Sequence, residues 1–488
     1  MQSYEELQDK LRPIEKMILA GHHRMALEKM RYMLAQNLFK PVEKWRVYQR
    51  IGDCCYELLR MEEAAAAYWQ SVNCTDGLPL PIQQMVYSNY LLVSHNLANV
   101  TTVELAQRHF TYQQLTVNMP HYRHTKKKHA KIRLGYIADK FIRNVLTFFS
   151  LHLLTGYDRN KFSVHVYSVE NFEDLITQKL RQEVFSYVNF PANTPATVIA
   201  ARIYTDEIDI LFDLGVHTLF GRTVQVLAHK PAPVQVAGIG YMSTSGIKEV
   251  DYFLTDGYLD PPGEHEAQFA EQLLRMKHSH WCYIPPGEFV AYNRKIDKPI
   301  VFGSFNKFGK ITKKMLSLWL QIISSVPHSK LLLKCPERQI NLLKVMEQKL
   351  KKAGFHTDQY ELEIGTSDYM QRYNDVDIFL DTYPYVGGAT TCDALMCGVP
   401  VITMYGERHG SRFGYSMLMN LGMGELAASS EREYVDKAIA LARDRDKLNK
   451  LHEVLPTVMK NSSLMDYAGY VQDFEEKMQE IYDNWLSE

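Results

Sequence analysis

The sequence lacks the features of a membrane-spanning, secreted or disulfide-stapled protein. No stretch approaches the ~20 apolar residues of a membrane helix, and the N-terminal segment MQSYEELQDKLRPIEKM has early acidic residues where a secretory signal would have an apolar core. The seven cysteines are odd in number and include no C-x-x-C pair, which argues against a disulfide framework or a zinc site. We therefore expect a cytoplasmic protein with no membrane span and no bound metal.

An excess of charge of either sign is also missing. The chain has 55 basic and 56 acidic side chains, so no overall field draws it to nucleic acid. A content of 46% hydrophobic and 23% charged residues is ordinary for a globular protein, and 488 residues are too many for one core. The composition predicts about three domains and no nucleic-acid partner.

The N-terminal quarter carries helical spacing and a weak internal repeat. A small residue is followed four positions later by a bulky one at Ala26–Met30, Ala64–Tyr68 and Ala106–Phe110. Small residues let the two helices of a hairpin approach closely, and the spacing between these markers is longer than the ~34 residues of a tetratricopeptide unit. The pattern predicts tetratricopeptide-like repeats over 1–120 and a charged linker over 121–130; an irregular helical bundle is the alternative.

Beyond the linker, short apolar runs alternate with helical spans, which is typical of parallel strands joined by crossover helices. The runs are 131–137, 162–169, 208–214, 234–241 and 252–255, then 300–305, 330–334, 362–365, 376–380 and 399–404. A Pro/Gly stretch at 284–287 separates the two sets. The sequence predicts two Rossmann-like domains, 131–290 and 291–460, and a C-terminal helix over 461–488. The fold class is α/β with an all-α N-terminal part.

The segment 377–398, DIFLDTYPYVGGATTCDALMCG, reads as strand, glycine-containing loop and helix. Free backbone N–H groups at such a helix start can bind a phosphate by donating hydrogen bonds to it, and glycines let a pyrophosphate approach the backbone. Thr390 and Thr391 can add hydroxyl donors, and Asp393 lies one turn further on, where a carboxylate can bind a ribose hydroxyl. The alternative is an ordinary capped helix of a Rossmann-like fold.

A second loop, FGSFNKFGK over 302–310, follows the first strand of the same domain. Loops at the carboxyl ends of parallel strands converge on one crevice, so Lys310 should meet a phosphate held by the helix at Thr390. A positioned cation stabilises the charge that builds on a leaving phosphate. A surface lysine that begins the next helix is the alternative.

Five blocks resemble the catalytic region of one family. They read DLGVHTLFGR (213–222), HKPAPVQVAGIGYMSTSG (229–246), DYFLTD (251–256), FGSFNKFGK (302–310) and DIFLDTYPYVGGATTCDALMCGVPVIT (377–403). In this order they resemble protein O-linked N-acetylglucosamine (O-GlcNAc) transferases, with the plant SPINDLY-like and bacterial members nearest. The segment YSNYLLVSHNL (87–97) is similar to the end of that family's repeats.

The resemblance implies a GT-B fold and an inverting, metal-independent transfer to Ser or Thr of a protein. It also implies a UDP-sugar donor, usually UDP-GlcNAc, that acts as a co-substrate, so that no cofactor is expected. By position, Lys310 corresponds to the catalytic lysine that contacts the donor diphosphate, and Asp393 to the acid that binds ribose. The rest of the implied UDP-sugar site is Asn306, Tyr369, Gly388, Ala389, Thr390, Thr391 and Arg412.

One segment departs from the family pattern. Where the family tends to have S-D-F-x-x-H-P, this chain has ADKFIRNV over 138–145, with Asn144 at the His position. Asn can hydrogen-bond a sugar or an acceptor but cannot act as a base near neutral pH. His217, in a D-L-x-x-H-T pattern, is then the remaining candidate for a catalytic role; a structural histidine at a strand end is the alternative.

The sequence therefore predicts an inverting glycosyltransferase that moves a sugar, GlcNAc by family habit, from UDP to a protein held by the repeats. The short repeat array suggests a dedicated acceptor such as a surface or flagellar protein. Two alternatives stay open. One is a catalytically degenerate GT-B scaffold that binds an acceptor or a partner glycosyltransferase, and the other is a UDP-sugar epimerase.

Overall fold

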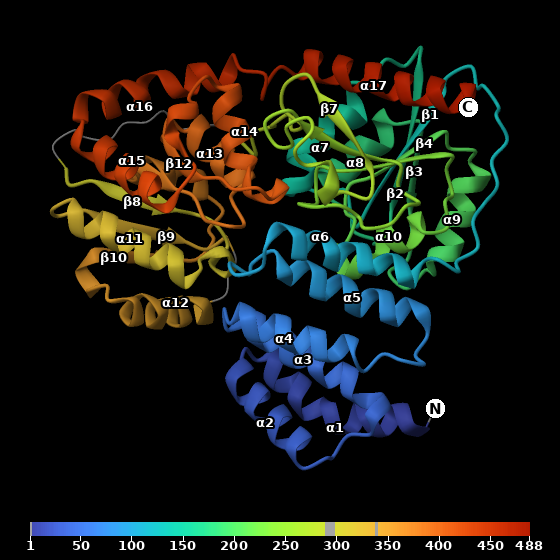
Figure 1. Cartoon of the computed structure of the whole chain (residues 1–488), viewed down its shortest axis with the longest axis horizontal. Helices are drawn as coiled ribbons and strands as arrows, with labels where there is room; N and C mark the ends of the chain where they lie inside the picture. Colours follow the sequence, from blue (N-terminus) through green and yellow to red (C-terminus); the bar gives the residue numbers. More distant parts are fainter. Residues whose placement is uncertain (1, 288–297, 337–339) are drawn as a thin grey trace.

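The computed structural model describes residues 2–287, 298–336 and 340–488, which form a helical N-terminal part and two α/β domains (Figure 1). The helical part lies below the junction of the two domains, which stand side by side. The N-terminal helices are α1 (Gln2–Leu19), α2 (His23–Ala35), α3 (Lys44–Glu57), α4 (Met61–Val72), α5 (Leu80–Ser94) and α6 (Thr102–Thr111).

These six helices form three successive hairpins, and each predicted marker alanine lies buried in the second helix of its hairpin. The middle hairpin shows why the small residues are needed. A Cβ atom added to Gly52 would lie 2.5 Å from a ring carbon of Tyr68, so α3 and α4 approach too closely for a larger residue. The helical repeats predicted from the sequence are confirmed.

The first α/β domain contains a seven-stranded, fully parallel sheet in the order β3-β2-β1-β4-β5-β6-β7. Its strands are β1 (Ile132–Ala138), β2 (Phe162–Ser168), β3 (Ser186–Asn189), β4 (Ile210–Asp213), β5 (Val234–Ala237), β6 (Tyr252–Asp256) and β7 (Gln272–Met276). The helices are α7 (Val145–Thr155), α8 (Leu175–Glu183), α9 (Ala196–Thr205) and α10 (Arg222–Leu227). The central strand β4 is buried along its whole length, as expected for a sheet covered on both faces.

The second domain contains a six-stranded parallel sheet in the order β10-β9-β8-β11-β12-β13. Its strands are β8 (Val301–Ser304), β9 (Lys330–Lys334), β10 (Tyr360–Glu363), β11 (Ile378–Leu380), β12 (Val401–Met404) and β13 (Ala427–Ala428). Its helices are α11 (Lys313–Ser325), α12 (Ile340–Ala353), α13 (Ala389–Met396), α14 (Phe413–Asn420), α15 (Glu431–Arg443) and α16 (Arg445–Lys460). The predicted boundary between 290 and 291 lies outside the described residues.

The last helix, α17 (Tyr467–Ser487), leaves the second domain and returns to the first, along the top of the view in Figure 1. Its Phe474 packs between the first sheet's Tyr136 and Phe212, with ring centroids 6.5 Å and 5.6 Å away. The chain thus crosses between the two domains twice.

Both sheets have the doubly wound order in which the chain turns in opposite directions from two central neighbours, β1 and β4 in the first and β8 and β11 in the second. The loops after these strands border the crevice where such folds bind ligands. An all-α N-terminal part that is followed along the chain by two Rossmann-like sheets confirms the predicted fold class.

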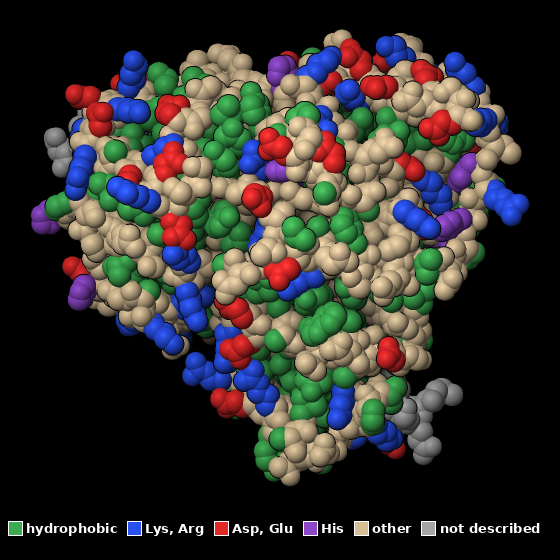
Figure 2. All heavy atoms as spheres, viewed as in Figure 1, with side chains coloured by type: hydrophobic (Ala, Val, Ile, Leu, Met, Phe, Trp, Pro, Cys, Tyr) green, Lys and Arg blue, Asp and Glu red, His purple; other side chains and the backbone are tan. Residues whose placement is uncertain are grey.

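The surface carries mixed charge on the face drawn in Figure 2, where basic and acidic side chains are interspersed. Within the three described ranges, no helix combines the length and the apolar character needed to cross a bilayer.

Candidate functional site

The loop between β11 and α13 lies at the switch point of the second sheet, and the fully buried Asp381 holds its shape. Oδ1 of Asp381 accepts hydrogen bonds from the backbone N–H groups of Thr382 at 2.8 Å and Gly387 at 2.7 Å. Oδ2 accepts one from Thr403 Oγ1 at 2.9 Å. Burial raises the pKa of this carboxyl, and the donors favour its ionised form. Asp381 therefore organises the loop from its buried side.

Asn306 joins this loop to the loop that follows β8. Its Nδ2 donates to Asp381 Oδ1 at 3.1 Å, and its Oδ1 accepts from Thr390 Oγ1 at 2.8 Å. A Cβ atom on Gly387 would lie 2.6 Å from Thr391 Oγ1 and 2.8 Å from Thr390 Oγ1, so only glycine fits beside both hydroxyls. The buried Thr391 Oγ1 has no hydrogen-bond partner among the described residues. The structure thus brings three predicted site residues to the start of α13.

Lys310 extends over the same loop from a short 3-10 helix, Phe308–Lys310. Its Nζ lies 3.8 Å from the centroid of the Tyr385 ring and donates to the Val386 carbonyl oxygen at 2.8 Å. The ammonium contacts a π face and a neutral carbonyl, and its positive charge opposes the rise in the pKa of Asp381 that burial causes. Lys310 thus lies on the β11–α13 loop, and its contact with a phosphate stays a prediction.

Asp393, one turn into α13, is buried between two tyrosines. Tyr283 donates a short hydrogen bond to Oδ1, and Tyr369 donates to Oδ2 at 3.4 Å. Burial raises the pKa of Asp393 to about 7, and the two tyrosine hydrogen bonds oppose this shift. The carboxyl is therefore poised to change charge near neutral pH, and its neighbour Tyr369 is one of the predicted site residues.

The first domain supplies the opposite wall at the start of α13. Gly388 is the N-cap residue of this helix, and a Cβ atom there would lie 3.2 Å from the indole of Trp281. Trp281 stacks on Phe149 of α7 at a centroid distance of 4.4 Å. Ala389, the first helical residue, is 8% exposed. The predicted phosphate-binding helix start thus faces an aromatic wall formed by the other domain.

Arg412 lies at a joint between the two α/β domains. Its Nε donates to the Tyr258 carbonyl oxygen of the first domain at 2.9 Å, and its Nη1 donates to the Gly406 carbonyl oxygen at 3.0 Å. In the same segment, Arg408 donates at 3.2 Å to the Leu97 carbonyl oxygen, which belongs to the turn between α5 and α6. All three parts of the chain meet here, and a donor contact by Arg412 stays a prediction.

His217 is fully buried where α5 packs on the first sheet. Its Nε2 donates to the Ser245 carbonyl oxygen at 2.8 Å, so its Nδ1, 2.9 Å from Ser88 Oγ, accepts from that hydroxyl. Burial lowers the pKa of His217 to about 3, which keeps the ring neutral. The structure does not place His217 beside Lys310 or Asp393, and its catalytic role stays a prediction.

Asn144 is the N-cap residue of α7. Its Oδ1 accepts from the backbone N–H of Thr147 at 3.1 Å, which satisfies one of the open donors at the helix start. The side chain is half-buried, and its amide nitrogen is not needed for this cap. A sugar or acceptor contact by Asn144 stays a prediction.

Sequence reasoning missed Tyr283 and Tyr385, which contact Asp393 and Lys310. Tyr385 lies inside the TYPYVGG loop, which the sequence already assigns to the predicted phosphate site. An aromatic partner for Lys310 could therefore have been sought there. Tyr283 comes from the far end of the first domain, and no local pattern connects it to residue 393.

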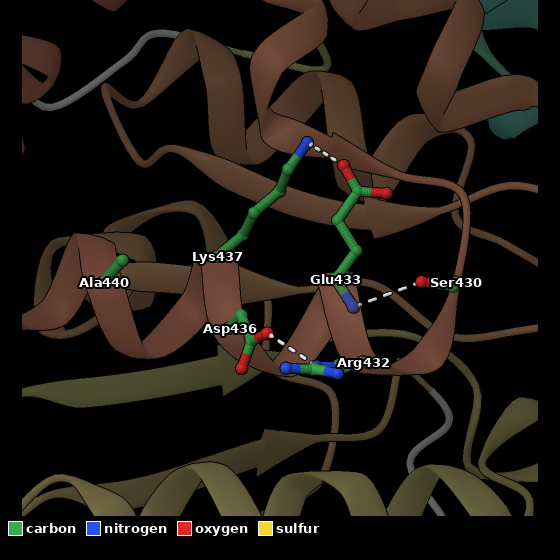
Figure 3. A pocket seen from close by; sticks show the side chains of 6 residues that line it. All are labelled: Ser430, Arg432, Glu433, Asp436, Lys437 and Ala440. Carbon is green, nitrogen blue, oxygen red and sulfur yellow. Dashed lines mark hydrogen bonds and ion pairs between the residues drawn. The ribbon is translucent and has the colours of Figure 1, made fainter.

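A shallow hollow on α15 is unrelated to this site (Figure 3). Its charged side chains pair along the helix, with Lys437 Nζ 2.7 Å from Glu433 Oε1 and Arg432 Nε 3.6 Å from Asp436 Oδ2. None of the predicted site residues lines it.

Two doubly wound parallel sheets in neighbouring domains define the GT-B class of glycosyltransferase folds, and the switch point of the second carries a lysine, a glycine-bordered helix start and a buried acid. The model of glycosyl transferase family 41 matches residues 87–284 and 290–474. The chain belongs to glycosyl transferase family 41.

Named relatives agree with this assignment. The probable UDP-N-acetylglucosamine–peptide N-acetylglucosaminyltransferase SPINDLY of Arabidopsis thaliana is 36% identical over 356 residues, which cover 70% of this chain and 38% of the plant protein. Its tomato counterpart, from Solanum lycopersicum, is 34% identical over 354 residues, with the same coverage of 70% and 38%. The chain therefore spans less than half the length of these relatives.

A solved structure of a mutant O-GlcNAc transferase from Thermobaculum terrenum has the same fold. It superposes with a TM-score of 0.85 at 24% identity, covering 96% of this chain and 89% of that one.

Proposed function

We propose that this chain is an inverting protein O-glycosyltransferase that moves N-acetylglucosamine from UDP-GlcNAc to Ser or Thr hydroxyls of a protein. The observation that carries the proposal is the convergence of Lys310, the Asn306–Thr390 pair and Asp393 at the switch point of the second sheet. In this proposal these residues supply the phosphate and ribose contacts of the nucleotide sugar, and their place in a family 41 chain supports that role.

In this proposal the diphosphate binds at the start of α13, where open backbone N–H groups and the Thr391 hydroxyl can donate to it. Lys310 turns from the Val386 carbonyl toward the phosphate, because a dianionic ligand is a stronger partner than a neutral carbonyl. Asp393 accepts a hydrogen bond from a ribose hydroxyl, which requires Tyr283 or Tyr369 to give way. Gly388, Ala389 and Arg412 complete the donor site as predicted from the sequence.

The transfer itself is a single displacement. The acceptor oxygen attacks the anomeric carbon from the face opposite UDP, the bond between that carbon and the phosphate oxygen breaks, and its electron pair leaves with UDP. Lys310 and the helix N–H groups stabilise the resulting charge, the task that a metal performs in other enzymes, and we propose that neither metal nor cofactor takes part. The hydroxyl proton goes to a base or to water. For His217 to be that base, its Nδ1 must be released from Ser88.

The acceptor protein binds, in this proposal, to the three helical hairpins next to the site. As the acceptor we propose a dedicated protein in the cytoplasm, such as a surface or flagellar protein, rather than a broad set of proteins.

One observation favours a second candidate, a degenerate scaffold that binds nucleotide sugar without transferring it. Both first-domain residues predicted to face sugar and acceptor are engaged in structural contacts, His217 with Ser88 and Ser245 and Asn144 as the cap of α7. Such a scaffold would present an acceptor or a partner glycosyltransferase instead of modifying it.

Transfer of labelled GlcNAc from UDP-GlcNAc to protein tests the two against each other. The transferase predicts label that is released by β-elimination, as expected of an O-linked sugar, and that is absent with Lys310→Ala. Parallel reactions with other UDP-sugars and with a GDP-sugar identify the donor. UDP binding without transfer of any sugar would favour the scaffold.

A further inference from the structure

The loop that carries Lys310 is packed against the helical repeats. Gly309 faces the start of α4: a Cβ atom added there would lie 2.8 Å from Met61 Cε and 3.9 Å from the Tyr56 hydroxyl. Met61 is 5% exposed and is the first residue of α4. The middle hairpin of the repeats therefore forms the surface on which the donor-site loop rests.

Lys349 of α12 bridges the same two segments. Its Nζ donates to the Leu59 carbonyl oxygen, in the turn between α3 and α4, at 3.1 Å. The same Nζ lies 3.5 Å from the carbonyl oxygen of Ile311, the residue that follows Lys310. Leu59 adopts a left-handed backbone conformation, φ 55°, which is unusual for a leucine. One ammonium thus connects a strained turn of the repeats to the donor-site loop.

The repeats also lie close to Tyr385, whose ring contacts the Lys310 ammonium. The Tyr385 ring is half-buried and lies near two residues of the repeats. The ring of His95 is 6.4 Å away between centroids, and Tyr56 contributes to the raised pKa of Tyr385, behind burial. The end of α5 therefore lies near Tyr385, and the middle hairpin lies against Gly309, so that both parts of the repeats adjoin the neighbours of Lys310.

We propose that Lys349 is a positioning residue that fixes Lys310 on the donor diphosphate through the repeats, so that the middle hairpin is a structural part of the donor site. The inference rests on the proposed function and adds a role for the repeats besides acceptor binding. A charge placed by a loop loses much of its effect when the loop shifts, and a displacement of about 1 Å can cost on the order of 10²-fold in rate.

The test uses the full chain with Lys349→Met, which keeps the length of the side chain and removes its donors. UDP affinity should fall about tenfold and kcat should fall with it, while the KM for the acceptor changes little. Lys352→Met on the same helix is the matched control, because Lys352 is exposed, and it should behave like the wild type. Lys349→Arg should recover part of the loss.

A double-mutant cycle with Lys310→Ala separates positioning from general damage. If Lys349 acts through Lys310, Lys349→Met weakens UDP binding no further in the Lys310→Ala background. Equal losses in both backgrounds would overturn the inference, as would unchanged UDP affinity in Lys349→Met.

Met61→Ala loosens the packing of the repeats against Gly309 and is the second variant, for the case that Lys349→Met does not fold. It should show the same donor-binding defect. Unchanged UDP affinity in that variant would likewise contradict the inference. Failure of the folded wild type to bind UDP would instead refute the proposed donor site itself, and the inference with it.

Discussion

The switch points of the two α/β domains are similar in structure, but the loops beyond them make different contacts. Each has a fully buried aspartate at the end of the second of its two central strands, Asp213 as the last residue of β4 and Asp381 directly after β11. Each accepts backbone hydrogen bonds from its own loop, Asp213 from Gly215 at 2.8 Å and Asp381 from Gly387 at 2.7 Å. Burial raises the pKa of both carboxyls.

The loops diverge beyond these aspartates. In the first domain the loop closes against the repeats, where a Cβ atom on Gly221 would lie only 2.1 Å from Ser88 Oγ and His217 is bonded to the same hydroxyl. In the second domain the loop leads to Gly387 and the start of α13, beneath Lys310. The first switch point thus holds the repeats, and the second is the donor site that we propose. Substitutions at the first switch point should therefore change mainly stability, and substitutions at the second should change mainly UDP binding.

The largest effect is expected for Lys310→Ala. Removal of the cation that stabilises the leaving UDP should lower kcat by about 10²–10³-fold. UDP affinity should fall as well, without a large change in melting temperature, because Lys310 is only half-buried. Steady-state kinetics and titration calorimetry check both expectations. Wild-type turnover in this variant would contradict the role assigned to Lys310.

Gly387→Ala should weaken UDP binding by about tenfold, because its Cβ would displace the Thr390 and Thr391 hydroxyls from the helix start. Gly257→Ala is the control, since a Cβ atom there meets nothing within 4 Å. Calorimetry on both variants measures the difference, and an equal UDP affinity would show that the hydroxyls are not part of the donor site.

A smaller effect is expected from pH. The pKa of Asp393 is about 7 in the folded protein against 3.8 in its ordinary state. Protonation therefore stabilises the fold, and this contribution is full below the unfolded pKa and is lost as pH rises through about 7. Ionised Asp393 is the better acceptor for ribose, so UDP affinity should rise a few-fold from about pH 6 to about pH 8.

Asp393→Asn separates this effect from the titration of UDP itself. The part of the rise that belongs to Asp393 should be absent in the variant, as should the corresponding loss of thermal stability over the same range. Identical pH profiles for variant and wild type would show that Asp393 does not titrate in the binding range.

The smallest effect on donor binding is expected for Ser88→Ala. It leaves Nδ1 of the buried His217 without its donor, which should cost about 1–3 kcal/mol of stability. UDP affinity should stay within about twofold of the wild type, because the first switch point fastens the repeats. Chemical denaturation measures the loss of stability, and calorimetry measures UDP affinity. A large loss of UDP affinity in Ser88→Ala would contradict the proposed difference between the two switch points.

Local patterns predicted most of the fold. The central strands were found because they are buried apolar runs, whereas β3, β7 and β13 were missed. β3 is half-buried along its length, β7 mixes polar with apolar residues, and β13 has only two residues. All three lie at or next to sheet edges, where burial imposes the weakest pattern on the sequence.

For the proposed donor site, the sequence could predict which residues lie together where this depends on one loop and on the strand order. Asn306, Lys310 and Thr390 meet because neighbouring parallel strands end at the same edge. The tyrosine at 283 and the burial of His217 depend on how the domains and repeats pack, which no single segment encodes. The same holds for the contact of Lys349 with Leu59, 290 residues earlier in the chain.

The most direct test of the central claim is titration calorimetry of UDP with the wild type and with Asp393→Ala, with GDP as the comparison nucleotide. We expect saturable UDP binding by the wild type, weaker binding of GDP and a sharp loss of UDP affinity in the variant. Equal UDP binding by both proteins would contradict the assigned ribose contact. No UDP binding by a folded wild type would contradict the donor site at the second switch point.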